Sequence, residues 1–400
     1  MSWKKKYEEN WGRLGMKSEW KIETLADVCK VVTDGSHYSP HSVQKGKYMV
    51  SVKDFTEYGF DFSQCRQISE QDYEKLQKGG CVTEYQDILV GKDGARYFED
   101  IILYRQDERP ALLSSIAILR CDESKIMPEF LYYLLKMPSV QKNVKENYGS
   151  GSAIPRIVLK DFRRMPVQYP DIKTQEAIVS ILQCIDEKIQ VNLRINKNLY
   201  KQMLFIFNNA KKTSSWKHHK LGDVLTFYDN LRKPLSSIQR EKMAHIYPYY
   251  GATSIVDYVE DYLFDGTYIL ISEDGANVVD ALGHPLTQYT YGKFWVNNHA
   301  HVVRGSSGYS EALIYAMLGT LNMQSIVTGA AQPKINQANL RNFETVLPEN
   351  EEAQVLSVIL TPMLQQMLYY DQENERLSTL RDTLLPQLMS GELDISAIDL

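Results

Sequence analysis

The feature that most constrains the fold of this chain is an internal repeat. Six residues near the N-terminus recur in the same order, each 196 positions further along. The pairs are Ser18 and Ser214, Trp20 and Trp216, Lys21 and Lys217, Leu25 and Leu221, Asp27 and Asp223, and Val28 and Val224. Self-similarity of this kind is the signature of a repeated architecture, so the two halves are expected to fold alike.

Three further pairs of segments carry the repeat through to the end of each half. Residues 88–95, ILVGKDGA, match 269–276, ILISEDGA, at an offset of 181. Residues 129–133 match 311–315 at 182, and 151–157, GSAIPRI, match 329–335, GAAQPKI, at 178. Because the order is kept while the offset drifts slowly, the pattern indicates a duplication followed by small insertions and deletions.

A long helical segment follows each repeat. Residues 174–209 contain no proline or glycine, and the positions spaced alternately by four and three are Ile178, Leu182, Ile185, Ile189, Asn192, Asn196, Leu199, Met203 and Ile206. A 3.5-residue spacing is typical of a helix that packs along a partner helix. Such a helix would be roughly 50 Å long. On its own, the segment is more typical of a core helix of one large domain than of a spacer.

The second long segment predicts a partner helix for the first. Asn196 and Asn374 occupy equivalent positions, and buried asparagines fix the register of coiled coils. The helices are therefore expected to pack antiparallel, with a seam formed by Ile185, Ile189, Asn196, Leu199, Met367, Asn374 and Leu377. Pro362 interrupts the second segment, so a helix break is expected there, with Thr361 as the cap.

The pattern as a whole predicts an α+β fold. Short β-rich runs at 47–52, 87–90, 115–119, 267–271 and 299–303 alternate with turn residues, and amphipathic helices are expected near 128–136 and 311–318. The predicted organisation is two α+β domains in pseudo-twofold repeat, separated by two long antiparallel coiled-coil helices. Its boundaries are an extension at 1–17, a domain at 18–170, a helix at 171–213, a domain at 214–348, and a helix with a tail at 349–400.

Composition narrows the class of protein. The chain has 400 residues, of which 44% are hydrophobic and 24% are charged, as in globular proteins that work in water. No apolar run approaches the ~18 residues that a membrane span needs. The five cysteines are Cys29, Cys65, Cys81, Cys121 and Cys184. They form no CxxC pair, which favours reduced thiols in a cytoplasmic protein over disulfides or a zinc site.

The sequence contains no recognisable catalytic motif. It has no phosphate-binding GxxxxGK[ST] loop, no GxSxG elbow and no methyltransferase tetrapeptide. Pro170-Asp171 and Asp186-Glu187-Lys188 superficially resemble a nuclease site, but Asp186 and Lys188 fall on different sides of a predicted helix. His299 and His301 share a strand face without a further metal ligand in view. We therefore predict no catalytic residue and no metal site.

Several motifs resemble the specificity subunit of type I restriction–modification enzymes. They are the two domain openings WKxxxLxDV at Trp20 and Trp216, the domain ends 151–157 and 329–335, and the C-terminal phrase LLPQLMSGEL at 384–393. Segments 247–252, YPYYGA, and 294–301, FWVNNHAH, are similar to one subtype of target-recognition domain. The resemblance covers nearly all of residues 18–393.

The resemblance implies a function without catalysis. A subunit of this kind reads a two-part sequence in double-stranded DNA, with one half-site for each recognition domain. It assembles with two methyltransferase subunits, which modify adenine N6 with S-adenosylmethionine, and with two restriction subunits, which use ATP and Mg. No cofactor is expected on the chain itself, and no membrane partner.

Residues suited to DNA contact occur in both expected domains, because side chains that donate or accept hydrogen bonds read base edges and phosphates. In the first domain the candidates are His37, Tyr38, Lys53, Lys92, Arg96, Ser150, Ser152 and Arg156. In the second they are Arg232, Lys233, Tyr249, Tyr250, Asn297, Asn298, His299, His301, Lys334 and Asn336.

Two alternatives remain open at this stage. One is a bivalent DNA-binding regulator that works without partners. The other is a DNA methyltransferase or nuclease with its own catalytic site, which a clear catalytic motif would favour.

Overall fold

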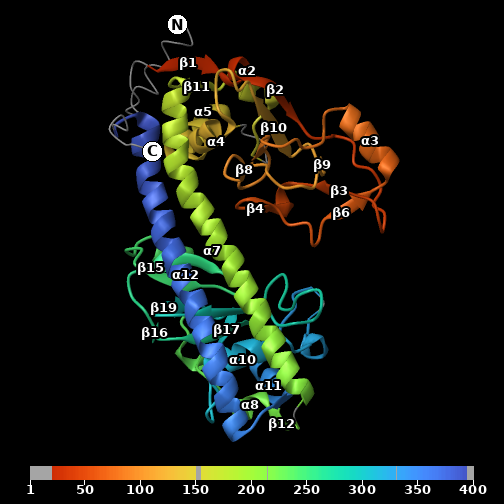
Figure 1. Cartoon of the computed structure of the whole chain (residues 1–400), viewed down its shortest axis with the longest axis vertical. Helices are drawn as coiled ribbons and strands as arrows, with labels where there is room; N and C mark the ends of the chain where they lie inside the picture. Colours follow the sequence, from red (N-terminus) through yellow and green to blue (C-terminus); the bar gives the residue numbers. More distant parts are fainter. Residues whose placement is uncertain (1–19, 150–154, 214, 330, 394–400) are drawn as a thin grey trace. The chain divides into compact units, whose positions relative to one another are not determined.

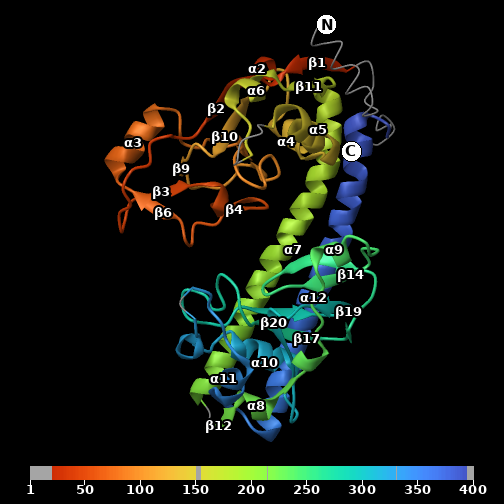
Figure 2. The same cartoon turned by 180° about the vertical axis from the view of Figure 1, so that it is seen from behind.

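The computed structural model describes residues 20–149, 155–213, 215–329 and 331–393. These residues form two compact units. The first contains residues up to Lys188 and those from Leu377 onward, and the second runs from Ile189 to Arg376. Figures 1 and 2 show the chain from opposite sides. The extension predicted at 1–17 lies outside the described residues.

The main sheet of the first unit has four antiparallel strands in the order β2 (Cys29–Asp34), β10 (Ile116–Cys121), β7 (Ile88–Gly91) and β8 (Ile101–Leu103). Side chains of β7 alternate between two cores. Ile88 and Val90 pack in the core that includes Phe130 of α4 (Pro128–Lys136), while Leu89 packs in a separate core. Because both faces of the strand are covered, its sequence is apolar at consecutive positions.

The main sheet of the second unit repeats this plan. Its order is β13 (Leu225–Phe227), β20 (Ala300–Gly305), β17 (Tyr268–Ser272) and β18 (Thr287–Thr290), again with antiparallel neighbours. Ile269 and Ile271 of β17 share a core with α10 (Glu311–Leu318), whereas Leu270 enters another core. The duplication found in the sequence is therefore a duplication of strand order and of core.

Each unit also has a smaller sheet that contains one parallel strand pair. In the first unit the order is β6 (Arg66–Ile68), β3 (Lys47–Val50) and β9 (Ala111–Leu112), with a hairpin of β4 (Phe55–Thr56) and β5 (Gly59–Phe60). In the second it is β15 (Ile255–Val259), β14 (Tyr247–Tyr250), β19 (Lys293–Val296) and β16 (Phe264–Asp265). The parallel pairs are β3 with β9 and β14 with β19.

The first and last strands of each repeat pair with each other. β1 (Lys21–Thr24) pairs with β11 (Pro166–Tyr169), and β12 (Lys217–Lys220) pairs with β21 (Glu344–Leu347). The short helices are α2 (Leu25–Val28), α3 (Glu70–Lys78), α5 (Pro138–Tyr148), α6 (Leu159–Arg164), α8 (Leu221–Val224), α9 (Ser237–Arg240) and α11 (Gln337–Asn342), with 3-10 turns η2 (Val52–Asp54), η3 (Asp229–Leu231) and η4 (Gln324–Ile326).

Two long helices complete the fold. α7 (Ile172–Thr213) contains the segment predicted at 174–209, and α12 (Asn350–Ser390) is its counterpart. The contacts of α7 fall at decreasing residue numbers along α12, so the helices are antiparallel. This confirms the predicted α+β fold with two long antiparallel helices. None of the helices in the described ranges is both long and apolar enough to span a membrane.

The helix break predicted at Pro362 is wrong, because α12 continues through that residue. Proline removes one backbone hydrogen bond, which normally goes to the carbonyl four residues earlier. That residue is Val358, whose side chain is 74% exposed, so water can reach this part of the helix. Leu360 and Leu364 on either side of the proline are buried in the core of the second unit. Their packing holds the helix together across the defect.

The two predicted asparagines lie at the helix pair, but they do not contact each other. The side-chain amide of Asn196 donates to the carbonyl oxygen of Met367 at 3.1 Å and to Asp371 at 2.7 Å. Asn374 instead accepts a hydrogen bond of 2.8 Å from Asn192, which is fully buried. Of the other seam residues, Ile185, Ile189 and Met367 are buried, while Leu199 and Leu377 are half-buried.

A buried ion pair joins the same helices within the first unit. Arg381 of α12 contacts Asp186 of α7 at 2.8 Å, and the Tyr133 hydroxyl donates to the same carboxylate at 2.7 Å. At the start of α7, Asp171 accepts a hydrogen bond from the backbone amide of Thr174. Asp171 and Asp186 therefore act as a helix cap and as an ion-pair partner, which accounts for the residues that resembled a nuclease motif.

The buried carboxyl of Asp371 gives a test of the helix pairing. Burial raises its pKa above the ordinary value, and hydrogen bonds from Tyr289 and Asn196 oppose this only in part. The folded state then binds the proton more tightly than the unfolded state, so the carboxyl costs stability as pH rises above about 4. Urea titrations at several pH values would measure the free energy of unfolding of wild type and of Asp371→Asn. We expect the value for Asp371→Asn to increase relative to that of wild type as the pH is raised from 4 to 8.

The control for the amide substitution itself is Asp265→Asn, at an exposed residue of β16 in the same unit. A difference between wild type and Asp371→Asn that grew in favour of wild type with rising pH would contradict the assigned burial.

Candidate nucleic-acid interface

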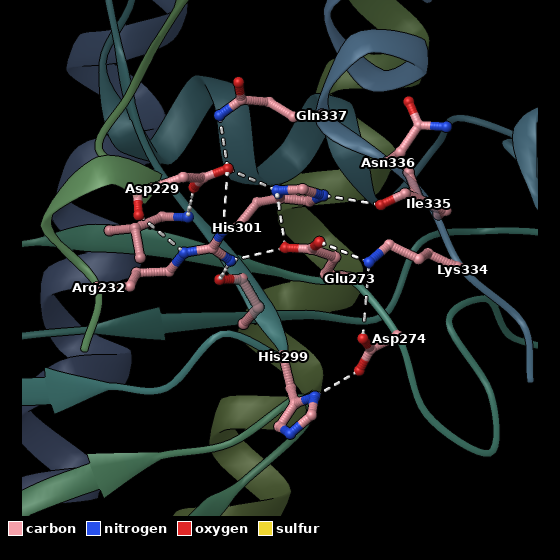
Figure 3. Close-up of polar contacts among 12 residues, drawn as sticks. Asp229, Arg232, Glu273, Asp274, His299, His301, Lys334, Ile335, Asn336 and Gln337 are labelled. Carbon is pink, nitrogen blue, oxygen red and sulfur yellow. Dashed lines mark hydrogen bonds and ion pairs between the residues drawn. The ribbon is translucent and has the colours of Figure 1, made fainter. Parts of the chain in front are cut away.

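Four segments of the second unit converge on one polar cluster, drawn in Figure 3. They are the turn η3 after β13, the residues that follow β17, the start of β20, and the segment that precedes α11. The cluster consists of Asp229, Arg232, Glu273, Asp274, His299, His301, Lys334, Ile335 and Gln337. Strand ends gather here because the antiparallel sheet brings the loops of alternate strands to one edge.

His301 is the buried centre of the cluster. Its side chain is 1% exposed, its Nδ1 lies 2.7 Å from the Asp229 carboxylate, and its Nε2 lies 2.8 Å from the Ile335 carbonyl oxygen. His301 is therefore held between two hydrogen-bonding partners, the Asp229 carboxylate and the Ile335 carbonyl oxygen.

Asp229 is the anionic partner of His301. Burial alone would raise the pKa of its carboxyl, but hydrogen bonds from His301 and from the backbone amide of Val302, with the nearby Arg232 guanidinium, hold that pKa below the ordinary value. The Gln337 side chain donates a further hydrogen bond of 2.6 Å. The carboxylate is thus ionised and fully engaged within the protein.

Glu273 joins two cations to the cluster. Arg232, which is 13% exposed, contacts the Glu273 carboxylate at 2.7 Å and also donates to the Ala300 carbonyl. Lys334 lies 3.0 Å from Glu273 and 3.8 Å from Asp274. The cations Arg232 and Lys334 thus lie among the carboxylates of Asp229, Glu273 and Asp274, and carboxylates with little exposure to water require such partners.

The first unit has a smaller cluster at the equivalent place. Lys92 follows β7 as Glu273 follows β17, and its ammonium lies 3.3 Å from Asp34 and 3.8 Å from Asp93. Lys92 is 8% exposed. The backbone bridge between Asp93 and Arg156 also has its counterpart between Asp274 and Lys334.

The residues predicted in the first domain divide into three groups. His37, Tyr38, Lys53, Arg96 and Arg156 are exposed, so their side chains face solvent. Lys92 is buried and engaged by Asp34, so it supports the surface without forming it. Ser150 and Ser152 lie outside the described residues.

The residues predicted in the second domain also differ in exposure. Lys233, Asn298 and His299 are exposed, and Lys334 and Asn336 are half-buried. Arg232, Asn297 and His301 are held by internal hydrogen bonds or ion pairs. Tyr249, 1% exposed, and Tyr250, 7% exposed, belong to hydrophobic cores. Both side chains are buried because β14 is covered on both faces, and contact of these two tyrosines with DNA stays a prediction.

Sequence reasoning missed the acidic members of both clusters: Asp34, Asp93, Asp229, Glu273 and Asp274. A search for DNA-binding side chains favours basic and amide residues and passes over carboxylates. The repeat could have pointed to these residues, because it aligns Lys92 with Glu273 and Asp93 with Asp274. The opposite charges of Lys92 and Glu273 in otherwise matching segments indicate that each side chain pairs with a residue of opposite charge.

Asp229, Glu273 and His301 also lie close enough to one another to hold a metal ion, since their ligand atoms fall within 4.8 Å. Arg232 and Lys334 already engage these carboxylates, so a metal would have to displace both cations. The surface beside the cluster is hollowed by about 480 Å³. Its lining is Phe227, Asp229, Asn230, Arg232, Glu273, His301, Gln337 and Arg341. The donor set fits a charge network better than a metal site.

The chain is thus a tandem repeat of one α+β domain, with a cluster of charged side chains at the same strand ends in each copy. Residues 17–201 and 213–378 match the family described as type I restriction modification DNA specificity domain. The chain therefore belongs to this family and carries its domain twice. The family comprises the non-catalytic recognition subunits of restriction–modification complexes.

Individual relatives agree with this assignment. The chain is 36% identical over 133 residues to a putative type I restriction enzyme specificity subunit, S.HindORF215P, of Haemophilus influenzae, a match that spans 33% of each chain. It is 22% identical over 312 residues to the MjaIX specificity subunit of Methanocaldococcus jannaschii, covering 68% of this chain and 71% of the relative. The crystal structure of the S subunit from M. genitalium shares the fold, with a TM-score of 0.50 at 17% identity over 94% of this chain and 98% of that one.

The ionised Asp229 predicts a pH dependence opposite to that of Asp371. Its lowered pKa means that it stabilises the folded state above about pH 4 and loses this effect as pH falls through the folded-state pKa. We expect Asp229→Asn to lower the free energy of unfolding by about 1–3 kcal/mol at pH 7, with a difference that shrinks in acid. Chemical denaturation across pH 3 to 7 would measure it, and a deficit independent of pH would contradict the assignment.

Proposed function

We propose that this chain is the DNA sequence-specificity subunit of a type I restriction–modification complex and recognises a bipartite target with one half-site per recognition domain. The observation that carries the proposal is the doubled family domain, with an equivalent polar cluster in each unit. Exposed donors and acceptors beside these clusters, such as His37, Lys233 and Asn298, suit contacts to phosphates and base edges.

The proposed partners are two methyltransferase subunits and two restriction subunits. In that assembly S-adenosylmethionine binds the methyltransferase subunits, and ATP and Mg bind the restriction subunits, in the cytoplasm. Apolar side chains on α12 support a docking role for the helices, since Val355, Val358 and Tyr369 are all more than half exposed. Large exposed apolar side chains in one stretch are typical of protein–protein contacts.

The central experiment is methylation mapping of the host genome with and without the gene. We expect one bipartite motif, methylated on adenine, to lose its modification throughout the genome when the gene is deleted and to regain it on complementation. Long-read sequencing detects the modified bases directly. A binding regulator that works without partners would leave every methylated motif in place, and that outcome would overturn the proposal.

The proposal also assigns the helices a role as a spacer between the half-sites. α7 has 42 residues, which corresponds to about 63 Å of helix, compared with about 34–36 Å per turn of DNA. The test lengthens both helices by the same amount, with seven residues inserted into each. The insertion sites are between Lys188 and Ile189 in α7 and between Arg376 and Leu377 in α12, and each insertion adds about 10 Å of helix.

We expect this insertion to lengthen the unspecified spacer by up to about three base pairs, given a rise of about 3.4 Å per base pair, and to leave both half-sites unchanged. The control is a variant with the same seven residues inserted after Gly292, in an exposed turn of the second domain. The spacer role would be refuted by a motif in which the bases of either half-site changed while the spacer stayed constant.

A further inference from the structure

The residue after the central strand of each recognition unit carries a buried charge, and the sign differs between the units. In the first unit it is Lys92, whose side chain is 9% exposed, and in the second it is Glu273, whose side chain is 13% exposed. A buried charge is costly unless it is paired, so a reversal of sign requires reversed partners. The partners are indeed reversed, with Asp34 facing Lys92 and Arg232 facing Glu273.

The backbone around these two residues is the same in both units. The amide of Ile157 donates to the carbonyl oxygen of Lys92 at 3.0 Å, and the amide of Ile335 donates to that of Glu273 at 2.8 Å. The amide of Lys92 donates to Ser115, just before β10, and the amide of Glu273 donates to His299, just before β20. In each unit, main-chain hydrogen bonds therefore connect the end of the central strand to two other segments. One segment leads into the neighbouring strand, and the other contains Ile157 or Ile335.

The side chain adds a fourth segment, the loop that follows the first strand of the main sheet. In the first unit Asp34 is the last residue of β2, and the loop that follows it carries the exposed His37 and Tyr38. In the second unit it contains Arg232, next to the exposed Lys233. We call Lys92 with Asp34 and Asp93 the first charge clamp, and Glu273 with Arg232 and Lys334 the second charge clamp. Figure 3 shows the second clamp beside His301.

We propose that Lys92 and Glu273 are positioning residues for DNA recognition, each fixing the reading loops of one half-site through its own charge clamp. This inference rests on the proposed function. Neither residue needs to touch DNA, because its charge is already engaged by the protein. Recognition of a base edge depends on donors placed to within a fraction of an ångström, so release of a loop reduces discrimination more than it reduces overall affinity.

The partners of the two clamps differ in sign, since Asp34 is complementary to a lysine and Arg232 to a glutamate. Neutralising Lys92 leaves Asp34 and Asp93 without their shared cation. Neutralising Glu273 leaves Arg232 and Lys334 without their shared anion.

The test uses the complete system in a host without adenine methylation, with motif analysis by long-read sequencing. Lys92→Met and Glu273→Gln remove the charges at similar side-chain size. We expect each to relax one half of the motif, with at least a tenfold loss of discrimination there, and to relax different halves. Lys92→Arg keeps the charge and should retain wild-type specificity. The matched controls Lys78→Met and Glu260→Gln alter exposed residues and should leave both halves intact.

Comparing a double variant with its two single variants distinguishes a positioning role from loss of folding. Arg232→Gln and Glu273→Gln each remove one side of the same ion pair. The double variant should therefore lose no more discrimination in the methylated motif than the more affected single variant does. The unaffected half-site reports in the same molecule that the subunit is folded and assembled.

The outcomes distinguish this inference from the proposed function. A wild-type system that yields no bipartite motif would refute the proposed function. A wild-type motif that Lys92→Met and Glu273→Gln leave unchanged, or in which either variant relaxes both halves together, would refute the charge clamps alone.

Discussion

A charged group in the interior of a protein must have a partner, and this constraint shapes both the recognition faces and the helix pair. On the second face it brings the cations Arg232 and Lys334 to the carboxylates of Asp229, Glu273 and Asp274. The same rule produces the simpler pair of Lys92 and Asp34 on the first face. The polar clusters therefore belong to the framework, and the residues beside them are left to contact a ligand.

Buried polar side chains between the two long helices also require partners, and here the partners fix the helix register. Asn192 and Asn196 are buried between α7 and α12 and bond to Asn374 and Asp371. An apolar seam would accept several registers, whereas these hydrogen bonds are satisfied in only one. Pro362 does not disturb this register, because the apolar side chains on either side keep their packing.

Much of the fold could be predicted from the sequence, because repeats, helical spacing and strand alternation are local patterns. The antiparallel helices and the duplicated α+β domains followed from them. Burial at single positions could not be predicted. Tyr249 and Tyr250 carry hydroxyl groups that can bond to DNA, yet both side chains are buried because β14 is covered on both faces. Arg232 and His301 were read as ligand-binding residues because their partners, Glu273 and Asp229, are distant in sequence.

The central claim is that two recognition domains read separate halves of one DNA target. The most direct measurement is the methylated motif of a subunit in which residues 18–170 are replaced by the corresponding domain of a relative with a known target. The account predicts that one half of the motif changes to that of the donor while the other half stays as in wild type. A hybrid in which both halves changed, or neither, would contradict it.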